Sequence, residues 1–98
     1  MVAFHVFVNG QRVCLAGIGE KGVMGIAVDW ASNRGGDSNN PNLKLTVGGL
    51  NQETREFSHW NTPPIKLGDE VTIKIVEAAT VDKESLRYAP DRDESNRE

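Results

Sequence analysis

The sequence predicts an all-β fold: a small antiparallel β-sandwich or partly open barrel of about six or seven strands. Apolar and polar residues alternate in several short runs, which is the period of a strand with one buried face. Glycine-rich turns separate these runs at regular spacing, as in sandwiches and small barrels. The chain has 98 residues, enough for one domain and too few for a second core.

Length, composition and charge restrict how the chain can be divided into domains and which classes of partner it can bind. We expect a single β-domain over residues 1–88 and a flexible charged tail over 89–98. The net charge of −3 lacks the basic excess that phosphate backbones need, so nucleic acid is an unlikely partner. No apolar run is long enough to cross a bilayer, and no leader-like segment opens the chain. With a single cysteine, Cys14, these features favour a cytoplasmic protein.

The clearest strand signal lies within residues 66–77. Val71, Ile73 and Ile75 alternate with other residues, and β-branched side chains suit a pleated sheet. The Gly-Asp pair at 68–69 is typical of a turn. We expect this segment to be a central strand of the sheet.

The N-terminal segment predicts a hairpin, because Asn9-Gly10 between alternating runs is a strong signal for a two-residue turn. That turn predicts a register that pairs Val8 with Gln11, Phe7 with Arg12, Val6 with Val13, His5 with Cys14 and Phe4 with Leu15. The predicted core face carries Val2, Phe4, Val6, Val8, Val13 and Leu15, and the opposite face carries His5, Phe7, Arg12 and Cys14.

Residues 23–30 fit both a strand and a helix. Met24, Ile26, Val28 and Trp30 share a face at period two, but a helical period also aligns apolar residues. We favour a strand, because the run is short and an internal glycine weakens a helix.

The rest of the chain alternates loops with short strands. Residues 31–42 predict a long polar loop, and 43–47 a strand that ends at the glycine pair 48–49. Residues 55–60 predict a short partner strand. The segment 81–88 predicts a last strand or a short helix.

The predicted pairing of His5 with Cys14 raises the question of metal binding or catalysis. Histidine and thiolate are zinc ligands and also form base–nucleophile pairs. A structural zinc site needs four ligands, however, and a reactive thiol is usually exposed rather than placed in the middle of a strand. We therefore interpret Cys14 as a structural cysteine and expect no enzyme activity, no metal and no cofactor.

Two sets of residues are candidates for binding. Trp30, His59 and Trp60, with Arg34 and Asp37 of the polar loop, predict an aromatic platform for a small ligand. The competing interpretation is that at least one tryptophan packs in the core. A second set, His5, Phe7 and Arg12, predicts a protein interface on the outer face of the first hairpin, with a homodimer as one outcome.

These observations predict a non-catalytic domain that acts by protein–protein interaction, such as an inhibitor, an adaptor or an assembly subunit. The alternative is a module that binds a sugar or a nucleotide through Trp30, Trp60 and His59.

Overall fold

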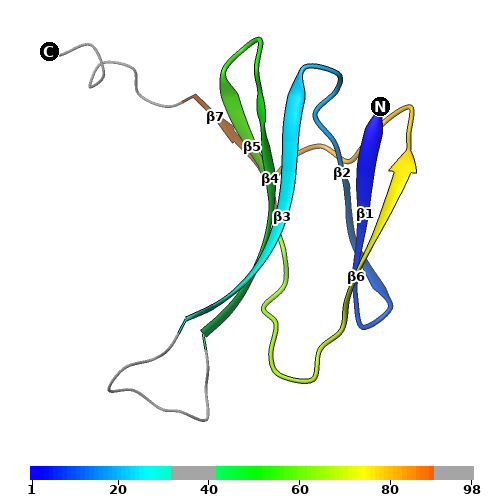
Figure 1. Ribbon diagram of the computed structural model, residues 1–98, viewed down its shortest axis with the longest axis vertical. Coiled ribbons are helices and arrows are strands. Elements are labelled where there is room, and N and C mark those ends of the chain that lie inside the picture. Colours follow the sequence, from blue (N-terminus) through cyan, green and yellow to red (C-terminus); the bar gives the residue numbers. More distant parts are fainter. Residues whose placement is uncertain (32–41, 90–98) are drawn as a thin grey trace, which may run out of the picture.

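The computed structural model describes residues 1–31 and 42–89 as two antiparallel sheets packed face to face (Figure 1). The strands are β1 (Val2–Val8), β2 (Gln11–Ala16), β3 (Gly22–Ala31), β4 (Asn42–Asn51), β5 (Glu56–Trp60), β6 (Val71–Glu77) and β7 (Leu86–Tyr88). One sheet has the order β2-β1-β6, and the other has the order β3-β4-β5-β7. The predicted all-β sandwich is confirmed. None of the described residues forms a helix long and apolar enough to span a membrane.

The core lies between the two sheets. Buried side chains come from both of them and form one cluster of Val6, Cys14, Ala16, Leu45, Val47 and Trp60. Half-buried residues such as Phe4, Ile18, Met24 and Ile26 surround this cluster. Burial of this apolar surface is the main force that holds the sheets together.

The first hairpin has the predicted turn but not the predicted register. Asn9 and Gly10 both adopt positive φ, at 53° and 81°, as a two-residue hairpin turn requires. Val8 pairs with Gln11 and Phe7 with Arg12, as predicted, but the register then shifts between Val6 and Phe7.

Because of this register shift, the faces predicted for the residues of β2 are wrong. Beyond it, Val6 pairs with Cys14 and His5 with Leu15, so the predicted His5–Cys14 pair is wrong. The extra residue in β2 turns Cys14 to the core face and Leu15 to the outer face.

The predicted strand within 66–77 exists as β6, but its predicted central position is wrong. β1 is the central strand of its sheet, and β6 is an edge. Ile73 pairs with buried Val6, and Ile75 with Phe4, so both isoleucines lie on the inward face. Ile75 nevertheless keeps 72% of its surface exposed, because it sits at the open border of the sandwich.

The remaining strands follow the prediction more closely. Residues 23–30 form a strand, which settles the helix alternative, and β3 pairs with β4 over ten consecutive residues without a bulge. The glycine pair 48–49 lies inside β4 rather than at its end. The predicted strand at 55–60 is β5, and the last segment contributes the short strand β7. Most of the predicted polar loop (32–41) and of the tail (90–98) lies outside the described residues.

The turn before β6 fastens this strand to the first hairpin. Asn9 Nδ2 donates to Asp69 Oδ1 at 3.0 Å, and the Lys66 amide donates to Asp69 Oδ2 at 2.8 Å. The Lys66 ammonium also lies 3.1 Å from this carboxylate. These bonds, with the one from Asn9 first, lower the pKa of Asp69 to about 2.

This turn predicts a specific acid sensitivity. The folded pKa of Asp69 lies below the ordinary value of about 3.9, so its stabilising contribution is complete above that value and is lost as the pH falls towards 2. The stability of an Asp69→Asn variant should therefore depend less on pH between about 4 and 2 than that of the parent. Urea denaturation at several pH values measures this slope. A carboxyl titration of Asp69 by NMR with a midpoint near 4 would contradict the prediction.

Candidate functional site

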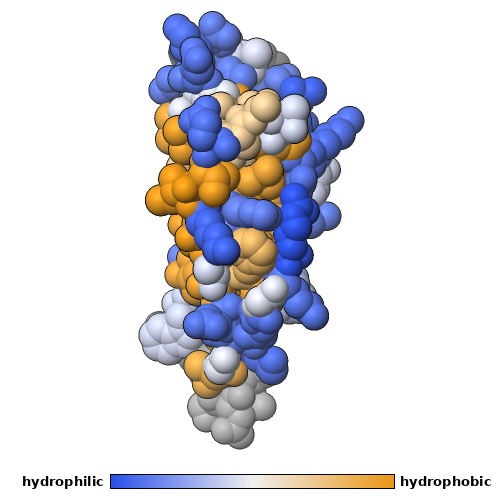
Figure 2. All heavy atoms as spheres, turned by 90° about the vertical axis from the view of Figure 1, so that its right-hand side faces the viewer, coloured by the Kyte–Doolittle hydropathy of each residue, from blue (hydrophilic) through white to orange (hydrophobic). Residues whose placement is uncertain are grey.

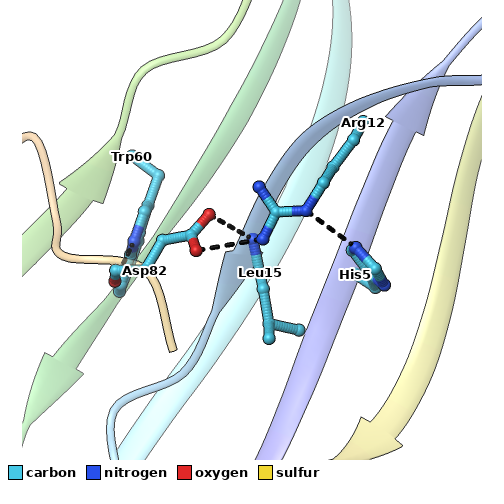
Figure 3. Close-up of polar contacts among 5 residues, drawn as sticks. All are labelled: His5, Arg12, Leu15, Trp60 and Asp82. Carbon is cyan, nitrogen blue, oxygen red and sulfur yellow. Dashed lines mark hydrogen bonds and ion pairs between the residues drawn. The ribbon is translucent and has the colours of Figure 1, made fainter. Parts of the chain in front are cut away.

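Asp82 joins the two sheets through four hydrogen bonds (Figure 3). Its amide donates to the Leu15 carbonyl at 2.8 Å, and its Oδ2 accepts from the Leu15 amide at 3.0 Å. Its carbonyl accepts from Trp60 Nε1 at 2.9 Å, and its Oδ1 accepts from Arg12 Nη2 at 3.0 Å. Asp82 therefore caps the free edge of β2 and holds it next to β5.

The same network continues across the outer face of the three-stranded sheet. Arg12 Nε donates to His5 Nε2 at 3.1 Å, an arrangement that requires a neutral imidazole. The His5 ring lies 4.5 Å from the Phe7 ring, and the Lys74 ammonium lies 5.2 Å from the Phe7 ring centre. The predicted interface residues His5, Phe7 and Arg12 thus do share one surface, but their side chains already contact one another.

This polar network joins the two sheets and stabilises the fold. The hydrogen bond from Arg12, followed by the one from Leu15, lowers the pKa of Asp82, so the carboxylate stays ionised. Cys14 lies on the opposite face of the sheet from His5, and burial is the first cause that raises the pKa of its thiol. Within residues 1–31 and 42–89, no group of three His, Cys, Asp or Glu side chains could hold a metal ion.

The three residues of the predicted aromatic platform that the structure describes, Trp30, His59 and Trp60, do not form one surface. Trp60 is 5% exposed and belongs to the core, which agrees with the packing interpretation for one tryptophan. Trp30 is 66% exposed near the far end of β3, and its partner on β4 is Leu43. His59 lies on the outer face of the four-stranded sheet, and Arg34 and Asp37 lie outside the described residues.

The outer face of the four-stranded sheet carries an apolar surface that the sequence did not predict. Register places seven of its residues on this face, away from inward-facing Val47 and Trp60. We call this set the apolar outer face: Val23, Ala27, Leu50, Phe57, His59, Leu86 and Tyr88. Val23 and Leu86 keep more than half of their surface exposed. Such a group of exposed apolar side chains is unusual on a monomer.

Three stacked aromatic rings, those of Phe57, His59 and Tyr88, form one half of this surface. The Tyr88 ring stacks between two neighbours on β5, at 5.6 Å from Phe57 and 5.9 Å from His59. The His59 and Tyr88 rings are nearly parallel, at 3°. Stacked rings on adjacent strands form a rigid wall, because each side chain limits the rotation of the next.

A shallow hollow of about 500 Å³ lies beside this wall. Gly25 and Gly48 pair directly across β3 and β4, so two adjacent positions of the sheet lack side chains. A methyl group added at Gly25 would meet no atom within 4 Å, whereas one added at Gly48 would meet the His59 ring. The histidine therefore covers Gly48, and the space above Gly25 is open.

A second exposed apolar region lies on the other side of the molecule. Figure 2 shows the side on which β1 and β6 lie in Figure 1, and hydrophobic residues form a band there among hydrophilic ones. Val2, Ile73 and Ile75 are the large exposed apolar residues of these two strands, but register places both isoleucines on the inward face, at the open border of the sandwich, and not on this outer side. Charged residues interleave with this region, so it is less continuous than the apolar outer face.

Comparison with known proteins does not assign the chain to a group. No protein-family model matches it, and no curated protein or solved structure is similar enough to count as a match. Any function must therefore be inferred from the surfaces described above.

Proposed function

We propose that this protein is a non-catalytic β-domain that binds another protein through its apolar outer face. The observation that supports this proposal is the exposed apolar surface built on β3, β4, β5 and β7. The rigid aromatic wall and the open hollow give this surface a defined shape. A role as an inhibitor, an adaptor or an assembly subunit fits such a surface. A cytoplasmic location stays a prediction from the sequence.

The shape of the hollow indicates how a partner would bind. A partner side chain would rest over Gly25, with Val23 and Ala27 beside it on β3 and the His59 ring across Gly48. Binding energy at such interfaces concentrates in a few buried apolar or aromatic side chains. The His59 ring supplies nitrogen atoms for one orienting hydrogen bond at the border of the hollow.

Site-specific photo-crosslinking in an extract of the native host tests this proposal. A photoreactive residue at Val23 should capture one discrete protein, because this position borders the hollow. The same residue at Thr72, an exposed position on the other sheet, is the matched control and should capture none. Substitution of Ala27 by glutamate should reduce the Val23 adduct at least about tenfold, because it places a charge within the interface.

The matched charge control is Thr72→Glu, which should leave the Val23 adduct unchanged. Equal capture at Val23 and Thr72 would contradict the proposal. So would an Ala27→Glu variant that folds normally and still captures the same protein in full yield.

The predicted alternative is a small-ligand module, and the hollow gives it one supporting observation. Its volume of about 500 Å³ lies within the range of ordinary ligand sites, and its lining is mostly apolar. An apolar or aromatic ligand would fit this lining better than a sugar, which needs several convergent polar groups. Protection of Val23 from crosslinking by a small hydrophobic molecule would favour this alternative over a protein partner.

A further inference from the structure

The outer edge of β3 pairs with no strand among the described residues, and its free backbone groups can be identified. The Gln52 amide donates to the Lys21 carbonyl at 2.8 Å, which makes Lys21 and Gln52 a hydrogen-bonded pair. Such pairs alternate along an antiparallel ladder, so the odd-numbered residues from Val23 to Asp29 also bond to β4. The N–H and C=O groups of Met24, Ile26, Val28 and Trp30 therefore point away from β4, towards the free edge.

This edge lacks the features that usually prevent strand pairing. Exposed edges are normally protected by lysine, proline, a bulge or shortness. β3 is ten residues long, keeps a regular register with β4, and contains neither lysine nor proline. Its one charged residue is Asp29. The other edge of the molecule on this side, β6, also carries exposed isoleucines.

We propose that β3 pairs antiparallel with β3 of a second copy of this chain, around a two-fold axis at Gly25. Backbone parity requires even-numbered residues to bond to even-numbered residues across the new ladder. With Gly25 at the axis, Met24 bonds with Ile26 of the second copy, and Gly22 bonds with Val28. The two four-stranded sheets then form one continuous sheet.

Charge complementarity selects this register. Centring on Gly25 places Lys21 directly opposite Asp29 of the second copy, and the symmetry repeats this pair. Both side chains are exposed, Asp29 lies on the outer face together with Val23, and Lys21 continues the same alternation one residue before β3. Oppositely charged residues that face each other across a ladder stabilise it, and like charges destabilise it. Within one chain the two residues are eight positions apart on a strand, about 26 Å, so they cannot contact each other.

The same axis would also cover apolar surface on the inward side. Asp82 holds β2 next to β5, so β6 lies at the opposite border of the sandwich, on the side of β3. A two-fold axis perpendicular to the joined sheet brings β6 of each copy towards β6 of the other. The exposed side chains of Ile73 and Ile75 would then face the second copy.

Sedimentation equilibrium of the full chain and of charge-exchange variants tests this proposal. We expect the parent chain to form a concentration-dependent dimer. Lys21→Glu and Asp29→Lys should each raise the dissociation constant about tenfold or more, because each replaces two attractive pairs by two repulsive ones. The double variant should restore an affinity close to that of the parent. Lys83→Glu, an exposed charge change on the segment next to β2, is the control and should have no effect.

A backbone variant separates pairing from side-chain effects. Val28→Pro removes an N–H that points to the free edge and leaves the bonds between β3 and β4 intact. This variant should stay folded by circular dichroism and be monomeric, whereas Val28→Thr should still dimerise. A monomeric parent up to millimolar concentration would overturn the proposal, as would an unchanged dimer in Val28→Pro. Dissociation by Phe7→Ala but not by Val28→Pro would instead place the interface on the first hairpin.

Discussion

Replacement of Trp60 by alanine is expected to lower the free energy of unfolding by about 3–5 kcal/mol. The indole is buried in the core between the sheets, and its N–H donates to the Asp82 carbonyl at 2.9 Å. The variant loses this apolar surface and also leaves a partly buried carbonyl without its partner. Small domains have a total stability of about 5–15 kcal/mol, so this loss is a large fraction of it. Urea denaturation followed by circular dichroism measures the change.

Two further variants separate packing from hydrogen bonding. Trp60→Phe keeps most of the apolar volume and loses the N–H, so it should cost about 1–2 kcal/mol. Trp30→Ala removes an indole that is largely exposed and should change stability by less than about 0.5 kcal/mol. Equal and small effects of the Trp30 and Trp60 variants would show that Trp60 is not a core residue.

Gly49 of β4 and Gly25 of β3 should respond in opposite directions to a single added methyl group. In Gly49→Ala the new methyl group would collide with the Val23 carbonyl oxygen and approach the Met24 sulfur. A backbone oxygen cannot move without disturbing the ladder between β3 and β4. We therefore expect a loss of about 1–3 kcal/mol.

Gly25→Ala is the matched variant on the facing strand. Its methyl group would enter open space, and alanine restricts the unfolded chain more than glycine does. Stability should rise by about 0.4–1 kcal/mol. The urea midpoints of both variants, measured at equal m-value, give the comparison. A stabilised Gly49→Ala or a strongly destabilised Gly25→Ala would contradict the described pairing of these strands.

Local signals predicted the elements of this fold better than their positions. Asn9-Gly10 predicted the first turn because only a few residues tolerate positive φ at both central positions. The register beyond it was mispredicted, because apolar residues follow one another in β2 and leave its face undetermined. A bulge there exchanges the faces of Cys14 and Leu15 without changing either residue type.

The residue pattern of a strand also does not show whether the strand is central or at the edge of its sheet. The alternation of Val71, Ile73 and Ile75 correctly identifies a strand with one apolar face. It does not say how many neighbours that strand has, because the neighbours are distant in sequence. β6 is thus an edge strand, and its isoleucines stay exposed.

The sequence of β3 contained a signal for the apolar outer face, but an analysis based only on apolar–polar alternation does not recognise it. Residues 23–28 are apolar or glycine at every position, so both faces of β3 avoid polar side chains. Strands of this kind are typical of sheets covered on both sides. In the described structure the outer face is open, and the inward face is covered only in part, since inward-facing Val28 is 54% exposed. In a small two-layer fold, a continuous apolar run such as residues 23–28 therefore indicates a surface that can bind a partner.

The pairing of β1 has a consequence for the kinetics of folding. β1 forms a local hairpin with β2, but its second neighbour is β6, so that Val2 pairs with Glu77. The N-terminal ammonium also contacts the Glu77 carboxylate at 2.8 Å. Closing a loop of this length loses chain entropy before any contact compensates for it, and such topologies fold slowly. On the ribosome, the first hairpin would emerge early and then wait for β6. During this interval the apolar face of the hairpin stays open to chaperones or to other nascent chains.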